Sequence, residues 1–462
     1  MSDEGFDMLK TEELAGFLVG IDRGSMSSAT RERAKDLLID HLAVSIQGLK
    51  TPWSKSISRY VQAEASKPEA VVYGAQRASA ALAALANGTI AHGIELDDTH
   101  DESMSHPGAV VFSAALAQAQ SSWRSGTDVL TAAIAGYEAM TRIGAALNRE
   151  LMSRGFHPTA LSGVFGSSTA AAVLLGMSAE QLRSTWGIVT SMASGSMAFT
   201  EDASGTMVKR LHAGWPAYSG VLASQLVRLG FTGPQNTLDS KTGFISMFSP
   251  APDRTGLTRS LGERWALDEI SIKPYACCRF FHALIDALEE SRRNDRWAGN
   301  DVASLTAFGP RMMVDGHLEY RPKSVMAAQY SLPYTVAVAI TGNARDPASF
   351  SDSAMHDPGL LGLADRVDAR IDPELDAMFP KKFPAGFEVR LKDGRELRCV
   401  VTDSVGTRER PMGREQIVEK FLSITADILS HERQMQLLDT VVGFDRLDDV
   451  GVLTRQLEEL DV

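Results

Sequence analysis

The sequence predicts a mainly helical protein interrupted by a smaller α+β domain. Apolar residues recur at helical intervals between Ala29 and about Leu229, with no stretch that alternates with a period of two. Strand-like segments appear between helices beyond Ile270, and the helical period returns after Pro411. The C-terminal helices could pack on either part.

The first half of the chain contains helices made of small residues. Residues 78–86 and 163–172 consist mainly of Ala, Gly and Ser, which is typical of central helices whose backbones approach closely. Gly176 is placed to end the second of these helices. The run from Ser178 to Gln181 then predicts a capping box that opens the next helix.

The clearest strands lie late in the chain. Alternating residues 387–392 and 395–400 flank Asp393-Gly394, which predicts a β-hairpin because glycine adopts positive φ readily. Residues 302–308 form a weaker strand candidate. Helices are expected around two apolar sets near the C-terminus: Ile417, Phe421 and Leu422, and Leu437, Leu438 and Val441.

Composition excludes several classes of protein. The 462 residues carry a formal net charge of −12, which argues against a nucleic-acid partner because phosphates require a basic face. No apolar run is long enough to span a membrane, and the acidic N-terminus differs from a basic presequence. Three cysteines make no disulfide framework. We therefore expect a soluble cytoplasmic protein.

The sequence contains none of the common signatures for cofactors or metals. Walker loops, Gly-x-Gly-x-x-Gly and zinc-ligand spacings are absent. We therefore expect no cofactor and no metal.

Residues 92–107 form the most concentrated polar segment, with three histidines and five carboxylates between two apolar helices. An ordinary surface loop with capping residues is one interpretation. The other is half of an active site, in which orienting groups lie near His106 at the start of the next helix: Glu95, Asp97 and Thr99. His-Pro is informative because proline favours the first helical position.

A second His-Pro pair repeats this pattern at His157, again before a helix of small residues. A single histidine is usually structural. Two histidines in the same context could converge on one pocket, where imidazoles serve as general acids and bases near neutral pH.

Two further segments carry cations and reactive side chains. Lys209, Arg210 and His212 are either a solvated basic turn or a clamp for substrate carboxylates. Where strand-like segments begin, beyond Ile270, three residues could close the pocket from the second domain: Lys273, Tyr275 and His282. Cys278 is a possible nucleophile, although burial of both adjacent cysteines in a structural role is the simpler interpretation. His41, His317, His356 and His431 lack comparable surroundings.

Together these segments resemble the MmgE/PrpD family, which includes 2-methylcitrate dehydratases, cis-aconitate decarboxylases and iminodisuccinate epimerases. The resemblance runs in order through almost the whole chain, in residues 87–92, 95–99, 106–107, 156–159, 209–212, 230–234, 273–278 and 443–447.

The resemblance implies a helical domain of residues 1–268 and 408–462, an inserted α+β lid domain of residues 269–407, a homodimer and a metal-free site between the domains. Residues on matching positions are Thr99, His106, His157, Lys209, Lys273 and His282. Glu95 stands where decarboxylases often have aspartate. Animal decarboxylases have histidine at the position of Cys278, so their proton relay does not transfer intact, whereas fungal-type enzymes share the Cys-Cys pair.

The leading hypothesis is a cofactor-independent lyase that acts on a small di- or tricarboxylate. Lys209, Arg210 and Lys273 would hold carboxylates, and His106 and His157 would transfer protons. Dehydration and decarboxylation both fit, as does epimerisation of a dicarboxylate such as iminodisuccinate. A catalytically silent binding protein and an enzyme that depends on the Cys278 thiol are further alternatives.

Overall fold

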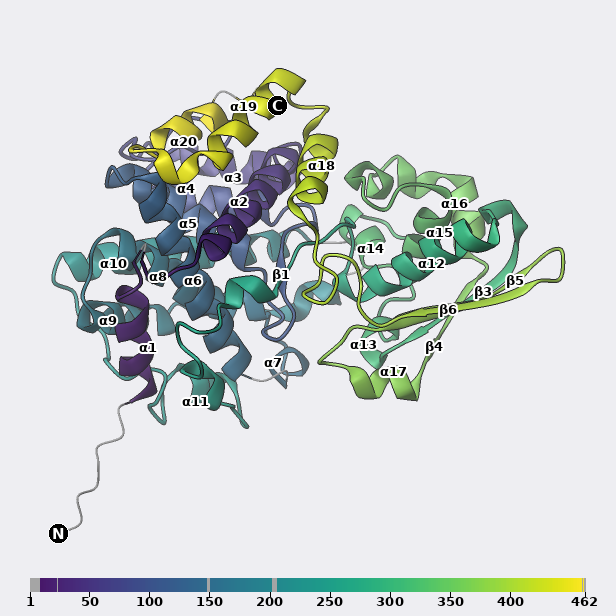
Figure 1. Ribbon diagram of the computed structural model, residues 1–462, viewed down its shortest axis with the longest axis horizontal. Helices are drawn as coiled ribbons and strands as arrows, with labels where there is room; N and C mark the ends of the chain where they lie inside the picture. Colours follow the sequence, from purple (N-terminus) through teal and green to yellow (C-terminus); the bar gives the residue numbers. More distant parts are fainter. Residues whose placement is uncertain (1–8, 23, 148–149, 202–205, 459, 461–462) are drawn as a thin grey trace, which may run out of the picture.

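The computed structural model describes residues 9–22, 24–147, 150–201, 206–458 and 460. The predicted mainly helical fold with a smaller sheet-containing part is confirmed (Figure 1). The N-terminal half contains α1 (Lys10–Val19), α2 (Ser28–Gly48), α3 (Pro52–Ala63), α4 (Ala80–Ala91), α5 (Pro107–Ser121), α6 (Gly126–Ala146), α7 (Glu150–Ser153), α8 (Pro158–Leu174), α9 (Ala179–Thr190), α10 (Val208–Arg228) and α11 (Phe244–Phe248).

The small-residue helices α4, α5, α8 and α10 pack against one another, and α6 packs on α8. Glycines permit this close approach: a Cβ at Gly136 would lie 2.8 Å from the carbonyl oxygen of Gly166 on the neighbouring helix. Gly176, with φ +67°, follows the C-cap residue of α8, Leu175. Ser178 and Gln181 form the predicted capping box of α9. Local sequence signals therefore set the ends of these helices correctly.

We predict that Gly136→Ala lowers the free energy of unfolding by about 1–3 kcal/mol, because the added methyl group overpacks the contact between α6 and α8. Gly16→Ala is the matched control, since a Cβ at that helical position meets nothing within 4 Å. Chemical denaturation would compare both variants with the parent chain. Equal stability of the two variants would contradict this account of the close packing.

The second part of the molecule is built on a four-stranded sheet of order β4-β3-β5-β6, in which only the β3 and β4 pair is parallel. The predicted hairpin is present, with Gly394 at φ +92° in its turn. The elements are α12 (His282–Asp295), β3 (Val302–Gly309), α13 (Arg311–Val314), α14 (Val325–Gln329), α15 (Leu332–Thr341), α16 (Pro358–Ala364), β4 (Val367–Ile371), α17 (Pro373–Met378), β5 (Ala385–Leu391) and β6 (Glu396–Val401).

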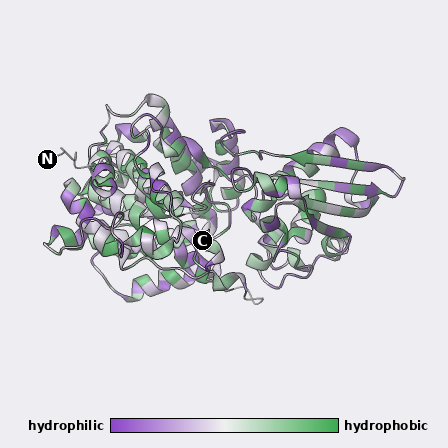
Figure 2. Cartoon of the chain, turned by 90° about the horizontal axis from the view of Figure 1, so that it is seen from below, coloured by the Kyte–Doolittle hydropathy of each residue, from purple (hydrophilic) through white to green (hydrophobic). Residues whose placement is uncertain are grey.

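One face of this sheet is covered by a helix, and the other face is exposed to solvent. Helix α12 packs on β5 and β6, where Phe387 and Val389 are buried while Glu388 and Arg390 point to solvent. Figure 2 shows the resulting mixture of hydrophobic and hydrophilic segments along the strands. This alternation is what an antiparallel sheet with a single packed face requires.

The C-terminal helices α18 (Arg414–Thr425), α19 (His431–Val442) and α20 (Gly451–Glu458) return to the N-terminal part. Both α18 and α19 pack against α2 (Figure 1). The buried Lys420 of α18 donates to Asp40 of α2 at 2.6 Å and to the Leu96 carbonyl oxygen at 2.9 Å. This packing supports, as a proposal, the division into residues 1–268 with 408–462 and residues 269–407.

The two parts are also joined by a short ribbon that the sequence did not reveal. Strand β1 (Thr99–His100) pairs antiparallel with β2 (Ile270–Ser271). Strand β1 lies within the polar segment of residues 92–107, so part of that segment is fixed against the start of the α+β domain. No helix among the described residues combines the length and apolar character needed to cross a membrane.

Candidate active site

Two histidines stand at the N-termini of neighbouring helices. His106 precedes Pro107 at the start of α5, and His157 precedes Pro158 at the start of α8. Proline suits this position because its missing N–H is not needed there. Helix α5 packs on α8, and the backbone N–H of His106 donates to Thr159 Oγ1 at 3.1 Å. The two His-Pro signals therefore meet at one place.

Two more histidines complete a buried cluster. Measured between ring centroids, His92 lies 4.9 Å from His106 and 6.1 Å from His157. The Nδ1 atoms of His157 and His212 are 3.1 Å apart. Burial lowers the pKa of His106 to about 3 and that of His212 to about 4, and it holds the pKa of His157 well below its ordinary value. These imidazoles are therefore neutral near pH 7 and can accept protons.

The Asp97 carboxylate lies between two of these histidines. Its Oδ2 is 2.7 Å from Nδ1 of His92 and 3.4 Å from Nδ1 of His106. Burial alone would raise the pKa of Asp97, but His106 and His92 hold it far below its usual range. Asp97 is therefore ionised and accepts hydrogen bonds, as the orienting role predicted for it requires.

Beside the histidines, three buried cations surround the carboxylate of Glu95. Lys209 Nζ contacts Oε1, Arg210 Nη1 donates to the same oxygen at 2.6 Å, and Lys273 Nζ lies 3.5 Å from Oε2. Burial alone would raise the pKa of Glu95, but these cations hold it well below its usual range. Glu95 sits at φ +56°, an uncommon backbone conformation for a residue with a side chain.

Lys209 combines deep burial with several polar contacts. Burial lowers its pKa to about 8, against the opposing effect of Glu95. Its Nζ also donates to the hydroxyl of Tyr330 at 2.8 Å and lies 5.1 Å from the centre of that ring. A lysine of this kind is protonated at neutral pH and yet gives up its proton more easily than an exposed lysine.

The guanidinium of Arg210 is hydrogen-bonded to other protein groups. Besides Glu95, its guanidinium donates to the His92 carbonyl oxygen at 3.2 Å and to Gln329 Oε1 at 3.5 Å, and it lies over the Trp53 ring. These contacts fix the loop that carries Glu95. Arg210 therefore contributes charge to the cluster, while Lys209 and Lys273 have fewer protein partners.

Thr99 lies on the ribbon between the domains. It pairs with Ser271 in strand register, and its hydroxyl donates to Asp101 Oδ1 at 3.3 Å. Thr99 is thus placed where the polar segment meets the α+β domain.

Tyr275 and His282, which were predicted for the site, contact other residues. The Tyr275 hydroxyl donates to Asp286 Oδ1 at 2.5 Å, and His282 Nε2 lies 3.4 Å from the Cys277 carbonyl oxygen. The rings of Tyr275 and His282 pack edge to face. Among the described contacts, these two residues join each other and the interior of the α+β domain, and the structure does not bring them into the histidine and lysine cluster.

Cys278 is close to the cluster, and burial raises the pKa of its thiol to about 11. The thiol is therefore protonated at neutral pH and is a poor nucleophile. We predict that Cys278→Ser retains turnover, which initial-rate assays of the folded variant would measure. Loss of turnover in a variant with unchanged thermal stability would instead support a thiol-dependent enzyme.

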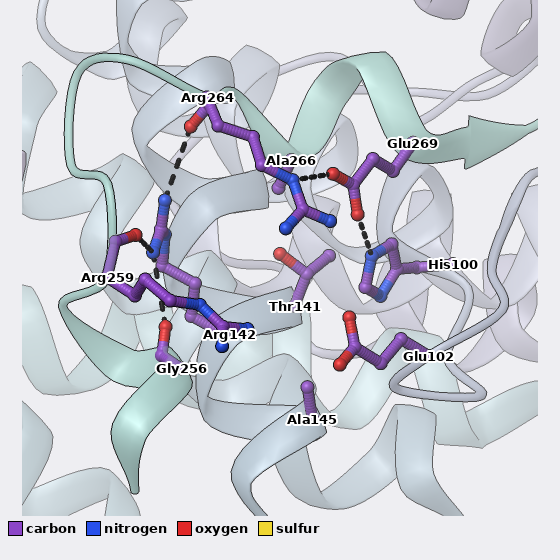
Figure 3. Close-up of a pocket in the computed structure, with 10 residues that line it drawn as sticks. All are labelled: His100, Glu102, Thr141, Arg142, Ala145, Gly256, Arg259, Arg264, Ala266 and Glu269. Atoms are coloured by element: carbon purple, nitrogen blue, oxygen red, sulfur yellow. Dashed lines mark hydrogen bonds and ion pairs between the residues drawn. The ribbon is translucent and has the colours of Figure 1, made fainter. Parts of the chain in front are cut away.

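Two cavities that share part of their lining lie beside the β1 ribbon. The smaller has a volume of about 60 Å³ and is drawn in Figure 3, where His100 and Glu102 face Glu269. The larger, of about 470 Å³, also reaches Lys381 of the α+β part, and Arg408. In the part of the chain that the structure describes, neither cavity is lined by His106, His157 or Lys209. Lys209 and Lys273 in the cluster are themselves buried.

By ligand type and spacing, two groups of described residues could hold a metal ion: His92, Asp97 and His106, and His100, Glu102 and Glu269. The first lies beside the positive charges of Lys209 and Lys273, which repel a divalent cation. In the second, Glu269 already pairs with Arg264 and His100 (Figure 3). Both groups therefore carry competing cations.

Sequence reasoning missed three residues that the structure places in or around the cluster. His92 ends a predicted helix and belongs to the polar segment, but its partners were not apparent. Tyr330 contacts Lys209, and Gln329 Nε2 donates to the carbonyl oxygens of Ile94 and Ala276. The apolar stretch around Gln329 and Tyr330 carries no motif that points to chemistry, so only the folded structure reveals them.

Both parts of the chain are similar to known proteins. Residues 12–256 match the MmgE/PrpD N-terminal domain, and residues 275–444 match the MmgE/PrpD C-terminal domain. The cis-aconitate decarboxylase of Aspergillus terreus is 29% identical over 475 residues, covering 97% of this chain and 95% of the relative.

Two further relatives extend the comparison. A cis-aconitate decarboxylase-like protein of Aspergillus oryzae is 29% identical, with 96% of each chain covered. The human cis-aconitate decarboxylase is 26% identical over 98% of this chain and 95% of its own length. Both family domains are present, and the chain therefore belongs to the MmgE/PrpD family.

Proposed function

We propose that the protein removes CO2 from a small tricarboxylate such as cis-aconitate, without a cofactor or metal. The observation that carries this proposal is the charge of the buried cluster. Three cations, Lys209, Arg210 and Lys273, outnumber the two ionised carboxylates, Glu95 and Asp97. A further carboxylate from a substrate would balance this charge inside an acidic protein.

The roles of the side chains follow from their protonation. Loss of CO2 breaks a carbon–carbon bond and leaves its electron pair on the remaining carbon framework, where nearby positive charge stabilises it. A proton must then be added to carbon. Lys209, with a pKa of about 8, is the most suitable acid in the cluster. The neutral His106 and His157 can accept protons and pass them on.

The same groups support other reactions on related substrates. Dehydration of 2-methylcitrate would use a neutral histidine as base and Lys209 as the acid that assists the departing hydroxide. Epimerisation of iminodisuccinate would use His106 and His157 on opposite faces of one carbon. The names of the relatives favour decarboxylation over these alternatives, and over a binding protein without activity.

The test is to incubate EDTA-treated protein with cis-aconitate, 2-methylcitrate, citrate and iminodisuccinate and to follow each by NMR. Proton spectra distinguish loss of CO2, loss of water and inversion of a centre. We expect decarboxylation of cis-aconitate. Exclusive turnover of 2-methylcitrate or iminodisuccinate would replace decarboxylation by the corresponding reaction, and no turnover of any carboxylate would overturn the proposal.

We also propose that two chains form a homodimer through the exposed apolar side of α10. Met207, Val208, Leu211 and Trp215 recur at helical spacing there and are exposed. We predict that light scattering gives about twice the 49.9 kDa chain mass, and that Leu211→Glu lowers it towards one chain. A monomeric parent protein would contradict this proposal.

A further inference from the structure

His92 is completely buried, and its two ring nitrogens have different surroundings. Nδ1 lies 2.7 Å from Asp97 Oδ2. Because Asp97 is ionised and has no proton to give, His92 donates Nδ1–H, which leaves an acceptor lone pair on Nε2. Among the described residues, Nε2 of His92 and Oδ1 of Asp97 are buried without a hydrogen-bond partner.

These unpartnered atoms of His92 and Asp97 lie beside the predicted catalytic histidines. Buried polar atoms in folded proteins are nearly always hydrogen-bonded, and exceptions concentrate where function requires them. His41 has the same pattern outside the cluster: its Nε2 is paired with the Tyr73 hydroxyl at 3.1 Å, and its buried Nδ1 has no partner among the described residues. The unpartnered nitrogen alone therefore does not assign a role. His92 instead lies within the histidine cluster, between the rings of His106 and His157.

Asp97 links His92 to the predicted base. Its Oδ2 also lies 3.4 Å from Nδ1 of His106. His106 donates that Nδ1–H to the Asp98 carbonyl oxygen at 3.0 Å, so its Nε2 carries the lone pair that accepts a proton. The imidazoles of His92 and His106 therefore share the Asp97 carboxylate. The hydrogen bond from His92 reduces the effect of the Asp97 negative charge on His106.

We propose that His92 is a positioning residue for His106, an inference that rests on the proposed function. Its Nδ1–H holds Asp97 in place and withdraws part of the carboxylate charge. His106 consequently stays neutral, with its Nε2 ready to accept a proton. Without His92, Asp97 would stabilise the protonated form of His106 more strongly, and it would lose the hydrogen bond that fixes its position against Nδ1 of His106.

Charged and titratable groups act on His106 from every side of the cluster. They are Asp97 and Glu95 on its own segment, His92 at the end of α4, His157 at the start of α8, Lys209 on α10, and Lys273 after β2. Lys209, Lys273 and His92 favour neutral His106, and Asp97 opposes them. A variant that changes only His92 therefore alters one contribution among several known ones.

The experiment compares His92→Phe, which removes the donor, with His92→Asn, whose amide N–H can replace Nδ1–H. We expect His92→Phe to lower kcat for cis-aconitate by about 10- to 100-fold, as when an outer partner of a functional histidine is lost. KM should change much less than kcat, and His92→Asn should recover most of the rate. His41→Gln, outside the cluster, is the control and should behave as the parent chain does.

A second measurement needs no turnover. NMR of protein containing ¹⁵N-labelled histidine reports the protonation of His106 directly. In His92→Phe the midpoint for His106 should rise by about one to two pH units, the effect of losing one charge-assisted hydrogen bond, and in His92→Asn it should stay near that of the parent. A purely structural role would lower thermal stability without moving this midpoint.

The outcomes separate this inference from the proposed function. Absence of turnover in the parent chain overturns the function, while the NMR midpoint still decides the role of His92. An unchanged midpoint in folded His92→Phe overturns the positioning role, and so does full activity of that variant. Equal loss in His92→Asn and His92→Phe also overturns it, because the donated hydrogen bond would then not be the cause.

Discussion

Replacing His157 by glutamine is expected to lower kcat by about 10²- to 10⁴-fold, the contribution of a well-placed general acid or base. Glutamine keeps a polar side chain of similar size but cannot carry a proton between groups. Because the contacts of Asp97 with His92 and His106 do not involve His157, that part of the cluster should remain in place. Initial rates with cis-aconitate and a thermal melt of the same sample would measure both effects.

The matched control is His41→Gln. His41 is buried, as His157 is, and its pKa is lowered to about 3, chiefly by burial, yet it lies on α2 and its ring is paired with Tyr73. It should keep the parent rate even if its stability falls. A His157→Gln variant with the parent rate would show that another group moves the proton.

Removing Lys209 is the second change with a large expected effect. Lys209→Ala should lower kcat by about 10²- to 10³-fold, the range seen when one preorganised charge-stabilising group is lost. The variant leaves Glu95 with Arg210 and Lys273 as partners, so the carboxylate keeps two buried cations. The fold should therefore survive, which circular dichroism would verify.

The pH profile gives this prediction a specific signature. Burial lowers the pKa of Lys209 to about 8, so its positive charge and its proton are present below that pH and are lost as the pH rises through it. Turnover should accordingly fall on the alkaline side of about pH 8. Lys209→Arg retains the charge but does not titrate in this range, so the alkaline fall should disappear from its residual activity. A Lys209→Arg profile identical to that of the parent would contradict the assignment.

The accuracy of the sequence predictions depended on whether the signal was local. His106 and His157 were identified because proline and small residues mark helix starts, and the structure confirms both helix starts. The hairpin at Gly394 and the capping box at Ser178 were also predicted, and both are present in the structure. In each case the decisive interactions join residues that are close in the chain.

Roles that depend on distant partners were harder to predict. Arg210 was expected to hold substrate, yet the structure gives it Glu95, His92 and Gln329 as partners. Tyr275 and His282 follow Lys273 closely in the sequence but point into the α+β domain. Spacing along an irregular segment does not fix which way successive side chains point. The directions of the Tyr275 and His282 side chains therefore could not be predicted from the sequence.

By itself, the sequence determined that the protein is mainly helical, that its acidic chain carries a few cations beside histidines, and that its motifs follow the order of the MmgE/PrpD family. These properties come from periodicity, turn chemistry and composition, which act over short distances in the chain. The tertiary structure decided that Lys209 meets Glu95 across 114 residues and Tyr330 across 121 residues, and that His92 shares Asp97 with His106. Such contacts depend on how closely the glycine-containing helices pack and on where the β1 ribbon fixes the second domain, so three-dimensional packing alone sets them.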